Sequence, residues 1–138
     1  MFAVRLATAD DLDFIIHSWL FSLWGSPVIR GMERDDYFLV LRPCVKGALA
    51  NSNCMTLVAC AEDDPNVILG WICVWAGHTA IWAYTKKSVR NMGVIRECLQ
   101  FANVTGYALP SSHVSVPSKY VYRPQIAWTL FGSNGQPT

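Results

Sequence analysis

The most constraining feature of this sequence is a succession of three strand-like segments between residues 54 and 85. Segments 55–61 and 67–75 are rich in β-branched and aromatic residues, and the acidic loop EDDPN separates them. A third run, HTAIWAYT at 78–85, follows Gly77, which favours a tight turn. Links this short join antiparallel strands, so the segment predicts an antiparallel meander.

Helical patterns lie on both sides of this meander. The segment 2–6 alternates like a short strand, and apolar residues at helical spacing after Asp10 predict a helix that ends at Gly25. A second helix is expected over 34–50, where Pro43 either kinks it or divides it into two short helices. A third is expected over 94–102.

The remaining C-terminal sequence is harder to assign. Gly106 is expected to mark the end of the third helix, and residues 107–120 read as a loop with some strand character. The run YVYRPQIAWTLF, residues 120–131, predicts one or two further strands. The resulting order favours one α+β domain over residues 1–138, with helices covering a mixed, largely antiparallel central sheet.

Composition limits the range of functions. The chain has 138 residues, 52% hydrophobic and 15% charged, with a net charge of +1. This balance argues against nucleic acid or an acidic membrane surface as a partner. Six Trp, six Phe and five Tyr are hard to bury completely in a domain of this size. Some of them are therefore expected to face a ligand groove, a partner chain or a second copy.

The five cysteines are scattered along the sequence and form no metal-binding spacing. We expect reduced thiols in a cytoplasmic compartment, and no metal site. The N-terminus carries charges too early for a signal peptide, and the longest apolar stretch, 69–84, is too short to span a membrane.

The segment KSVRNMGVIRECL, residues 87–99, has the features of an anion site. A strand ends in a loop with a central glycine and then enters a helix, whose first amides have no internal partners. Gly93 would let a phosphate approach the backbone, and Lys86, Lys87 and Arg90 add positive charge. The alternative is that Gly93 serves only tight packing of the helix on a strand. The spacing of a P-loop is absent.

The same residues resemble a known superfamily. The element order leading into Arg90-Asn91-Met92-Gly93-Val94-Ile95 is similar to the Gcn5-related N-acetyltransferases (GNAT), whose loop follows [Q/R]-x-x-G-x-[G/A]. The first and fourth positions match, whereas Ile95 stands where a small residue is usual. The segment 82–99 and the later Tyr122-Arg123-Pro124 also resemble a phage-encoded branch of this superfamily. The resemblance covers about residues 2–102.

The resemblance implies an acetyl-CoA site with assigned residues. The amides of Arg90, Asn91, Met92, Gly93, Val94 and Ile95 would hold the pyrophosphate. The strand before the loop would splay from its neighbour, and its end, including Tyr84 and Thr85, would offer backbone groups to the pantetheine arm.

Catalytic groups are less evident from the sequence. No acidic residue lies between Val67 and Arg96, although such enzymes often carry a Glu base there. His78 is the candidate base and Tyr122 the candidate acid. The alternatives are a surface histidine in a turn and a tyrosine that serves only packing.

Three functions remain open at this point. The first is an acetyl-CoA-dependent N-acetyltransferase that acts on a small-molecule or protein amine. The second is a catalytically inactive protein on the same fold, such as a phage virion or interaction component, found in the host cytoplasm or the virion. The third is an unrelated α+β binding module whose aromatic groove takes a peptide or a nucleobase.

Overall fold

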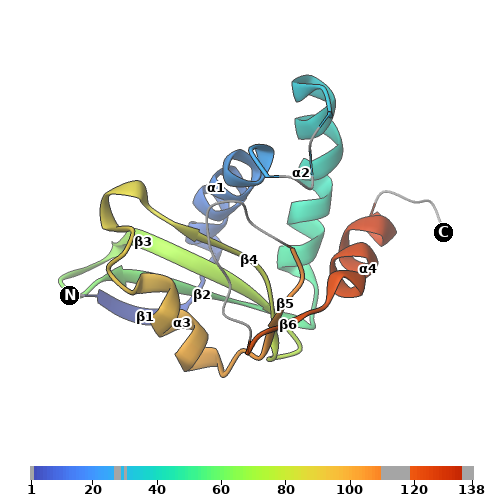
Figure 1. Cartoon of the computed structure of the whole chain (residues 1–138). Coiled ribbons are helices and arrows are strands. Elements are labelled where there is room, and N and C mark those ends of the chain that lie inside the picture. Colours follow the sequence, from blue (N-terminus) through green and yellow to red (C-terminus); the bar gives the residue numbers. More distant parts are fainter. Residues whose placement is uncertain (1, 27–28, 30, 110–118, 135–138) are drawn as a thin grey trace.

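The computed structural model describes residues 2–26, 29, 31–109 and 119–134. These residues form one six-stranded sheet in the order β1-β2-β3-β4-β5-β6, together with four α-helices (Figure 1). The strands are β1 (Phe2–Leu6), β2 (Cys54–Ala61), β3 (Asp64–Trp75), β4 (Thr79–Thr85), β5 (Gly106–Tyr107) and β6 (Val121–Tyr122). The helices are α1 (Leu12–Trp24), α2 (Arg34–Ala50), α3 (Val94–Ala102) and α4 (Pro124–Asn134).

The antiparallel meander predicted from the sequence is confirmed. Each of the pairs β1–β2, β2–β3 and β3–β4 is antiparallel. The β2–β3 turn is shorter than the loop EDDPN, because β3 already begins at Asp64. Two register shifts at the end of β2 accommodate this early start. The fold class, a mixed and largely antiparallel sheet flanked by helices, is therefore the expected one.

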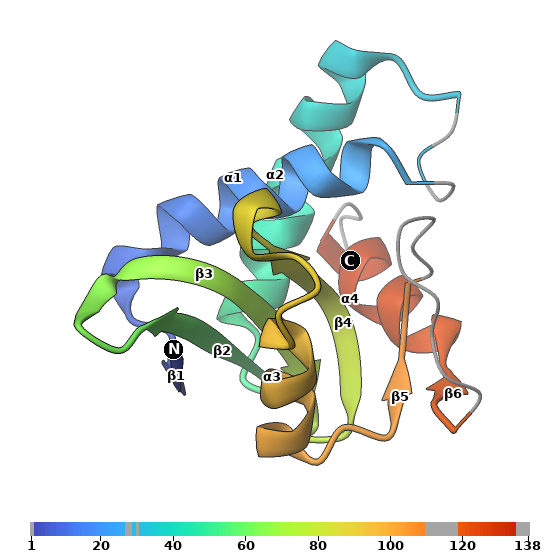
Figure 2. The ribbon, with the colours of Figure 1, turned by 60° about the vertical axis from the view of Figure 1, so that its left-hand side comes forward.

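The helices divide between the two faces of the sheet. The core on one face joins α1, α2 and α4 to residues such as Val58, Trp71 and Ile81. The other face is covered by α3, whose Val94 and Cys98 pack on Leu57 and Ile72. Figure 2 shows α3 in front of the sheet and α1 crossing behind it. Three of the tryptophans, at positions 19, 71 and 82, are buried, so much of the aromatic content serves the core.

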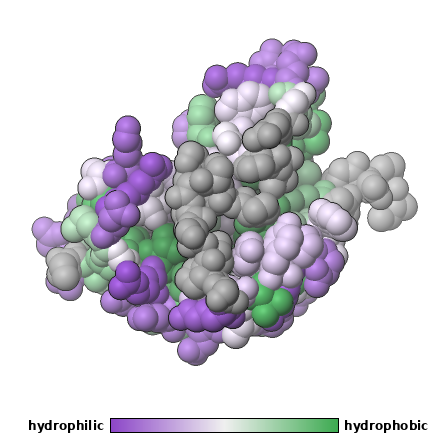
Figure 3. Space-filling view, viewed as in Figure 1, coloured by the Kyte–Doolittle hydropathy of each residue, from purple (hydrophilic) through white to green (hydrophobic). Residues whose placement is uncertain are grey.

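The polarity of the surface differs between the elements. Figure 3 shows hydrophilic residues at the exposed N-terminal end of α2 and a hydrophobic area near the middle of the sheet.

Pro43 lies on the exposed side of α2, which continues without division from Arg34 to Ala50. Of the two outcomes expected at Pro43, division into two helices is therefore wrong.

The C-terminal expectations need two corrections. Only Val121–Tyr122 of the run 120–131 forms a strand, and Pro124–Asn134 forms α4, which packs against α2. Proline is favourable at the first helical position, and Ala127, Leu130 and Phe131 then share one apolar face. Gly106 does not end α3. Asn103, with a φ of 55°, caps that helix, and Gly106 begins β5.

Candidate functional site

The distinctive feature of β4 is that, among the described residues, no strand lies beside most of one edge. Its parallel pairing with β5 covers only Thr79 and Ala80, and Figure 2 shows β4 curving away from β5 beyond that point. Lys86 N donates to Leu69 O at 2.8 Å, so by alternation Ala83 and Thr85 direct their backbone groups to the opposite, open edge. No described residue is paired with β4 along this part of the edge.

A bulge lies at the point where β4 leaves β5. The β3–β4 register changes from Cys73 opposite Trp82 to Val74 opposite Ala80, which leaves Ile81 as an extra residue on β4. A bulge of this kind bends the strand and increases its twist. The separation of β4 from β5 therefore has a local cause in the strand itself.

Two backbone amides of the connection from β4 to α3 donate within the connection itself: Arg90 N to Lys87 O and Met92 N to Val89 O, each at 3.4 Å. Asn91 and Gly93 have φ values of +70° and +79°, and Gly93 is the residue directly before α3. No heavy atom lies within 4 Å of the position that a Cβ on Gly93 would occupy. Close packing is thus not the reason for this glycine. The glycine that packs closely is Gly70, where a Cβ would lie 2.7 Å from Tyr84 O.

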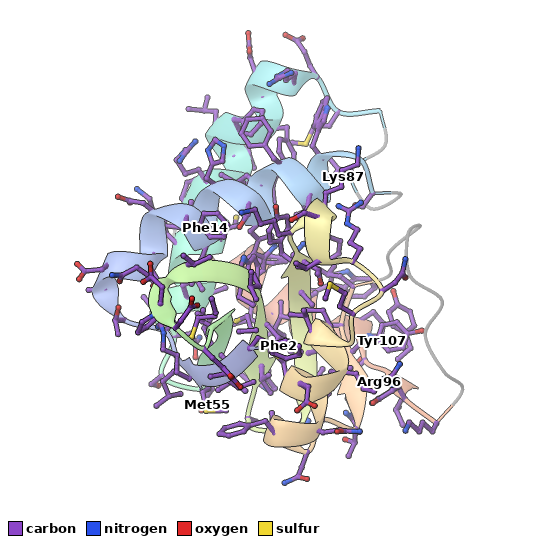
Figure 4. The ribbon with its side chains drawn as sticks, turned by 90° about the vertical axis from the view of Figure 1, so that its left-hand side faces the viewer. Phe2, Phe14, Met55, Lys87, Arg96 and Tyr107 are labelled. Carbon is purple, nitrogen blue, oxygen red and sulfur yellow. The ribbon has the colours of Figure 1, made fainter. Side chains whose placement is uncertain are left out.

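The basic residues of this connection are exposed. Arg90 Nε lies 3.5 Å from Thr85 O, at the end of the open edge. Lys86 and Lys87 are exposed beside it, and none of the three forms an ion pair with a described residue. In Figure 4, Lys87 lies on the connection at its end away from α3, whereas Arg96 lies on α3 itself. The positive charge of Lys86, Lys87 and Arg90 therefore lies in the connection before α3.

The structure brings most of the predicted cofactor-binding residues together and leaves the predicted catalytic residues apart from them. Tyr84 and Thr85 end β4, and residues 90–95 follow directly. Ile95 is half-buried at the start of α3. His78 precedes β4 at its opposite end, about 20 Å away by strand geometry. Tyr122, two strands across the sheet, stacks on Tyr107 with ring centroids 5.1 Å apart.

His78 belongs to a polar cluster that the sequence did not reveal. Its Nδ1 lies 2.6 Å from Thr79 Oγ1, and Arg123 Nη1 donates to the same hydroxyl at 2.8 Å. Arg123 Nη1 also lies 3.2 Å from Thr105 Oγ1. Thr79 is fully buried, so Arg123 ties the C-terminal segment to the first residue of β4.

A second missed feature is a row of serines that joins α1 to the sheet. Trp71 Nε1 on β3 donates to Ser18 Oγ at 2.8 Å, and Trp82 Nε1 on β4 donates to Ser22 Oγ at 2.8 Å. The spacing of four residues places both hydroxyls on one side of the helix. The four-residue spacing of Ser18 and Ser22 was the sequence signal, but its meaning depends on which strand lies below each serine.

Two open surface depressions lie away from this region. One, of about 490 Å³, is on α2 between Asp35 and Lys46, and the other, of about 300 Å³, is beside Asn103 and Tyr120. Neither is lined by a residue of β4 or of the connection to α3. We therefore base the candidate site on the backbone geometry of β4 and its loop.

Solved structures with a similar fold identify the architecture. A proposed acetyl transferase from Pyrococcus furiosus superposes with a TM-score of 0.61 at 12% identity, covering 100% of this chain and 94% of that one. An acetyltransferase of the GNAT family from Staphylococcus aureus Mu50 gives 0.52 at 14% identity, covering 78% and 72%. The chain has the GNAT fold.

A further solved structure with a similar fold contains a ligand. It is a predicted acetyltransferase with acetyl-CoA from Clostridium acetobutylicum, with a TM-score of 0.56 and 15% identity, covering 89% of this chain and 96% of that one. Identities this low establish the fold alone. No protein-family model matches the sequence, and no curated protein is similar to it. Among the described helices, none has both the length and the apolar character to span a membrane.

Proposed function

We propose that this protein is an acetyl-CoA-dependent N-acetyltransferase with an amine acceptor. The observation that carries the proposal is the continuity of the open edge of β4 with the basic loop before α3. An extended ligand with amides at one end and phosphates at the other matches this arrangement. The fold similarity to acetyltransferases supports the same assignment.

The phosphate end of the ligand would lie at Gly93. The first amides of α3, including those of Val94 and Ile95, have no partners within the helix and carry the positive end of its dipole. The open space at Gly93 allows a phosphate to come close to the backbone. Arg90, Lys86 and Lys87 supply the counter-charge. Ile95 departs from the small residue usual in the family, but its amide remains at the helix start.

The pantetheine arm would lie along β4. Its two amides can pair with the outward backbone groups of Ala83 and Thr85, as an added strand does at a sheet edge. The arm would then point from the loop toward the bulge at Ile81. The reacting end of the ligand would therefore lie where β4 meets β5.

Acetyl-CoA supplies an activated acetyl group as a thioester. In the transfer, a bond forms between the amine nitrogen and the carbonyl carbon while the carbon–sulfur bond breaks. The nitrogen loses a proton and the thiolate gains one. We retain His78 as the proposed base and Tyr122 as the proposed acid. The Nδ1 of His78 lies against Thr79, which leaves Nε2 for the proton.

A catalytically inactive binding protein on the same fold, such as a phage virion or interaction component, is the second candidate. The observation in its favour is the exposure of large apolar residues: Trp128 on α4 is 74% exposed, and Leu39 on α2 is 76% exposed. The same feature would suit a homo-oligomer. Turnover separates the two candidates, because both could bind the cofactor.

The test is a calorimetric titration with acetyl-CoA, CoA, desulfo-CoA and ADP. Gly93→Asn and Gly93→Asp form a matched pair, since both residues tolerate a left-handed φ and differ mainly in charge. We expect micromolar binding by the wild type, and binding by Gly93→Asp at least tenfold weaker than by Gly93→Asn. Equal affinities in the two variants, or no binding by the wild type at millimolar ligand, would reject the anion site.

Turnover is measured as release of free CoA thiol from acetyl-CoA in the presence of a panel of primary amines. Amine-dependent thiol release supports the transferase. Tight binding of acetyl-CoA with no release for any amine in the panel would favour the binding protein. His78→Ala is expected to lower turnover at least tenfold without changing the affinity for ADP.

A further inference from the structure

The exposed side of α2 carries apolar and charged residues in a regular order along the helix. Positions 35, 39, 42 and 46 follow the helical repeat, so their side chains share one side. All four residues are exposed, and the central one, Leu39, is 76% exposed. The depression of about 490 Å³ on this side is lined by six residues, which we call the α2 surface: Asp35, Phe38, Leu39, Arg42, Pro43 and Lys46. An exposed apolar centre of this kind is typical of a docking surface.

The two ends of the α2 surface carry opposite charges. Asp35 lies in the first turn of α2 beside Asp36, whereas Arg42 and Lys46 lie in the second half of the helix. None of these four side chains forms an ion pair with a described residue. A uniformly acidic or uniformly basic partner would be attracted to one end and repelled by the other. The complementary partner carries the same two charges in the reverse order.

A second copy of the chain has this reverse order when the two α2 helices lie antiparallel. The register that places Asp35 opposite Lys46 of the second copy also places Leu39 opposite Arg42 of the second copy. A two-fold axis repeats each contact, so two acid–base pairs flank the apolar centre. The aliphatic stem of Arg42 can cover the apolar side chain opposite it while its charged group stays in water. Antiparallel helices also bring opposite dipole ends together.

We propose that two copies of this protein form a symmetric dimer through antiparallel packing of their α2 surfaces. Figure 1 shows the N-terminal half of α2 extending beyond the sheet, where a second helix can approach it. Six residues line the depression, whereas a stable interface uses about 20–30 on each side, so we expect a weak and reversible dimer. No residue of β4 or of the connection to α3 lines the α2 surface, so the dimer does not depend on the proposed cofactor site.

The test is sedimentation equilibrium of the wild type and of two charge reversals, Asp35→Lys and Lys46→Asp, between about 5 and 500 µM. The mass of the wild type should rise with concentration from 15.4 kDa toward twice that value. Each reversal places like charges opposite each other at both symmetric pairs, so we expect self-association at least tenfold weaker. An equimolar mixture of the two variants restores both opposite-charge pairs. The mixture should therefore dimerise about as tightly as the wild type.

The controls carry the same changes of charge at exposed positions away from α2. Asp63→Lys and Arg96→Asp should each dimerise as the wild type does, and mixing them should not strengthen association. A wild type that remains at 15.4 kDa over the whole range would overturn the proposal.

Two further outcomes would also reject this interface. The first is undiminished self-association of both reversals, and the second is a mixture of the two reversals that remains monomeric. If Asp35→Lys does not fold, Asp36→Lys, at the same acidic end, replaces it in the comparison.

Discussion

The indole nitrogen of Trp82 donates a hydrogen bond of 2.8 Å to the hydroxyl of Ser22. The bond joins the middle of β4 to α1 across the core, and Trp82 is only 7% exposed. The position of α1 over β4 therefore depends on a polar contact inside an apolar interface.

Replacing Ser22 with alanine should leave the indole N–H of Trp82 buried without a partner. We expect the free energy of unfolding to fall by about 1–3 kcal/mol. Urea denaturation measures the change, with Trp82→Phe as the background that lacks the donor. In that background Ser22→Ala should be much less destabilising, and an equal loss in both backgrounds would show that the hydrogen bond is not the cause.

Gly70 is predicted to be intolerant of any side chain. Its Cβ would lie 2.7 Å from Tyr84 O and 3.0 Å from Val94 Cγ1, at the contact of β3 with β4 and the start of α3. We expect Gly70→Ala to cost about 1–3 kcal/mol of stability and to weaken CoA binding, because it displaces both sides of the proposed site.

Gly25→Ala is the control for that substitution. Gly25 has a φ of −83° and no heavy atom within 4 Å of its Cβ position. The Gly25→Ala variant should therefore fold and bind CoA as the wild type does. A Gly70→Ala variant with the stability and affinity of Gly25→Ala would contradict the close approach seen here.

Arg123 should hold the short strands β5 and β6 against β4. Arg123→Met removes the hydrogen bonds to Thr79 and Thr105 while keeping most of the side-chain volume. We expect faster amide hydrogen exchange at Thr105 and Gly106, whose N–H groups donate to His78 O. Arg42→Met, at an exposed position on α2, should leave these rates unchanged. Unchanged exchange in Arg123→Met would mean that backbone pairing alone holds the segment.

The ion pair between Arg5 and Asp11 should make stability depend on acid pH. Arg5 Nη1 lies 2.7 Å from Asp11 Oδ2, and this hydrogen bond is the main cause that lowers the pKa of Asp11 to about 2. A lowered pKa in the folded state stabilises the protein above pH 4, and this contribution is lost as the pH falls toward 2. Asp11→Asn should therefore cost about 2 kcal/mol at pH 7 and much less at pH 2.

Thermal unfolding of both proteins between pH 2 and pH 7 measures this dependence. Asp13→Asn, which changes an exposed carboxylate in the first turn of α1, is the control and should have a small effect at every pH. A constant difference between wild type and Asp11→Asn over the whole range would reject the ionic origin of the stabilisation.

The local structure of the candidate site was predictable from the sequence where its residues are close together in the chain. The residues from Tyr84 to Ile95 are continuous, so a strand, a glycine loop and a helix start could be predicted from local pattern alone. The proposed roles of His78 and Tyr122 depend on where β4 begins and where the C-terminal segment joins the sheet. The role of Arg123 could not be assigned from the sequence, because its partners Thr79 and Thr105 are distant in the chain.

The sequence by itself determined the meander β2–β3–β4 and the helices α1, α2 and α3, because short links and apolar periodicity act within about 20 residues. It did not determine whether YVYRPQIAWTLF would be strand or helix, since a short apolar run suits both until its partner is known. The tertiary structure decided this by packing α4 on α2 and by joining Arg123 to Thr79, 44 residues earlier in the chain. It also decided that β5 pairs with β4 only at Thr79 and Ala80, because the pairing of one strand depends on where every other segment lies.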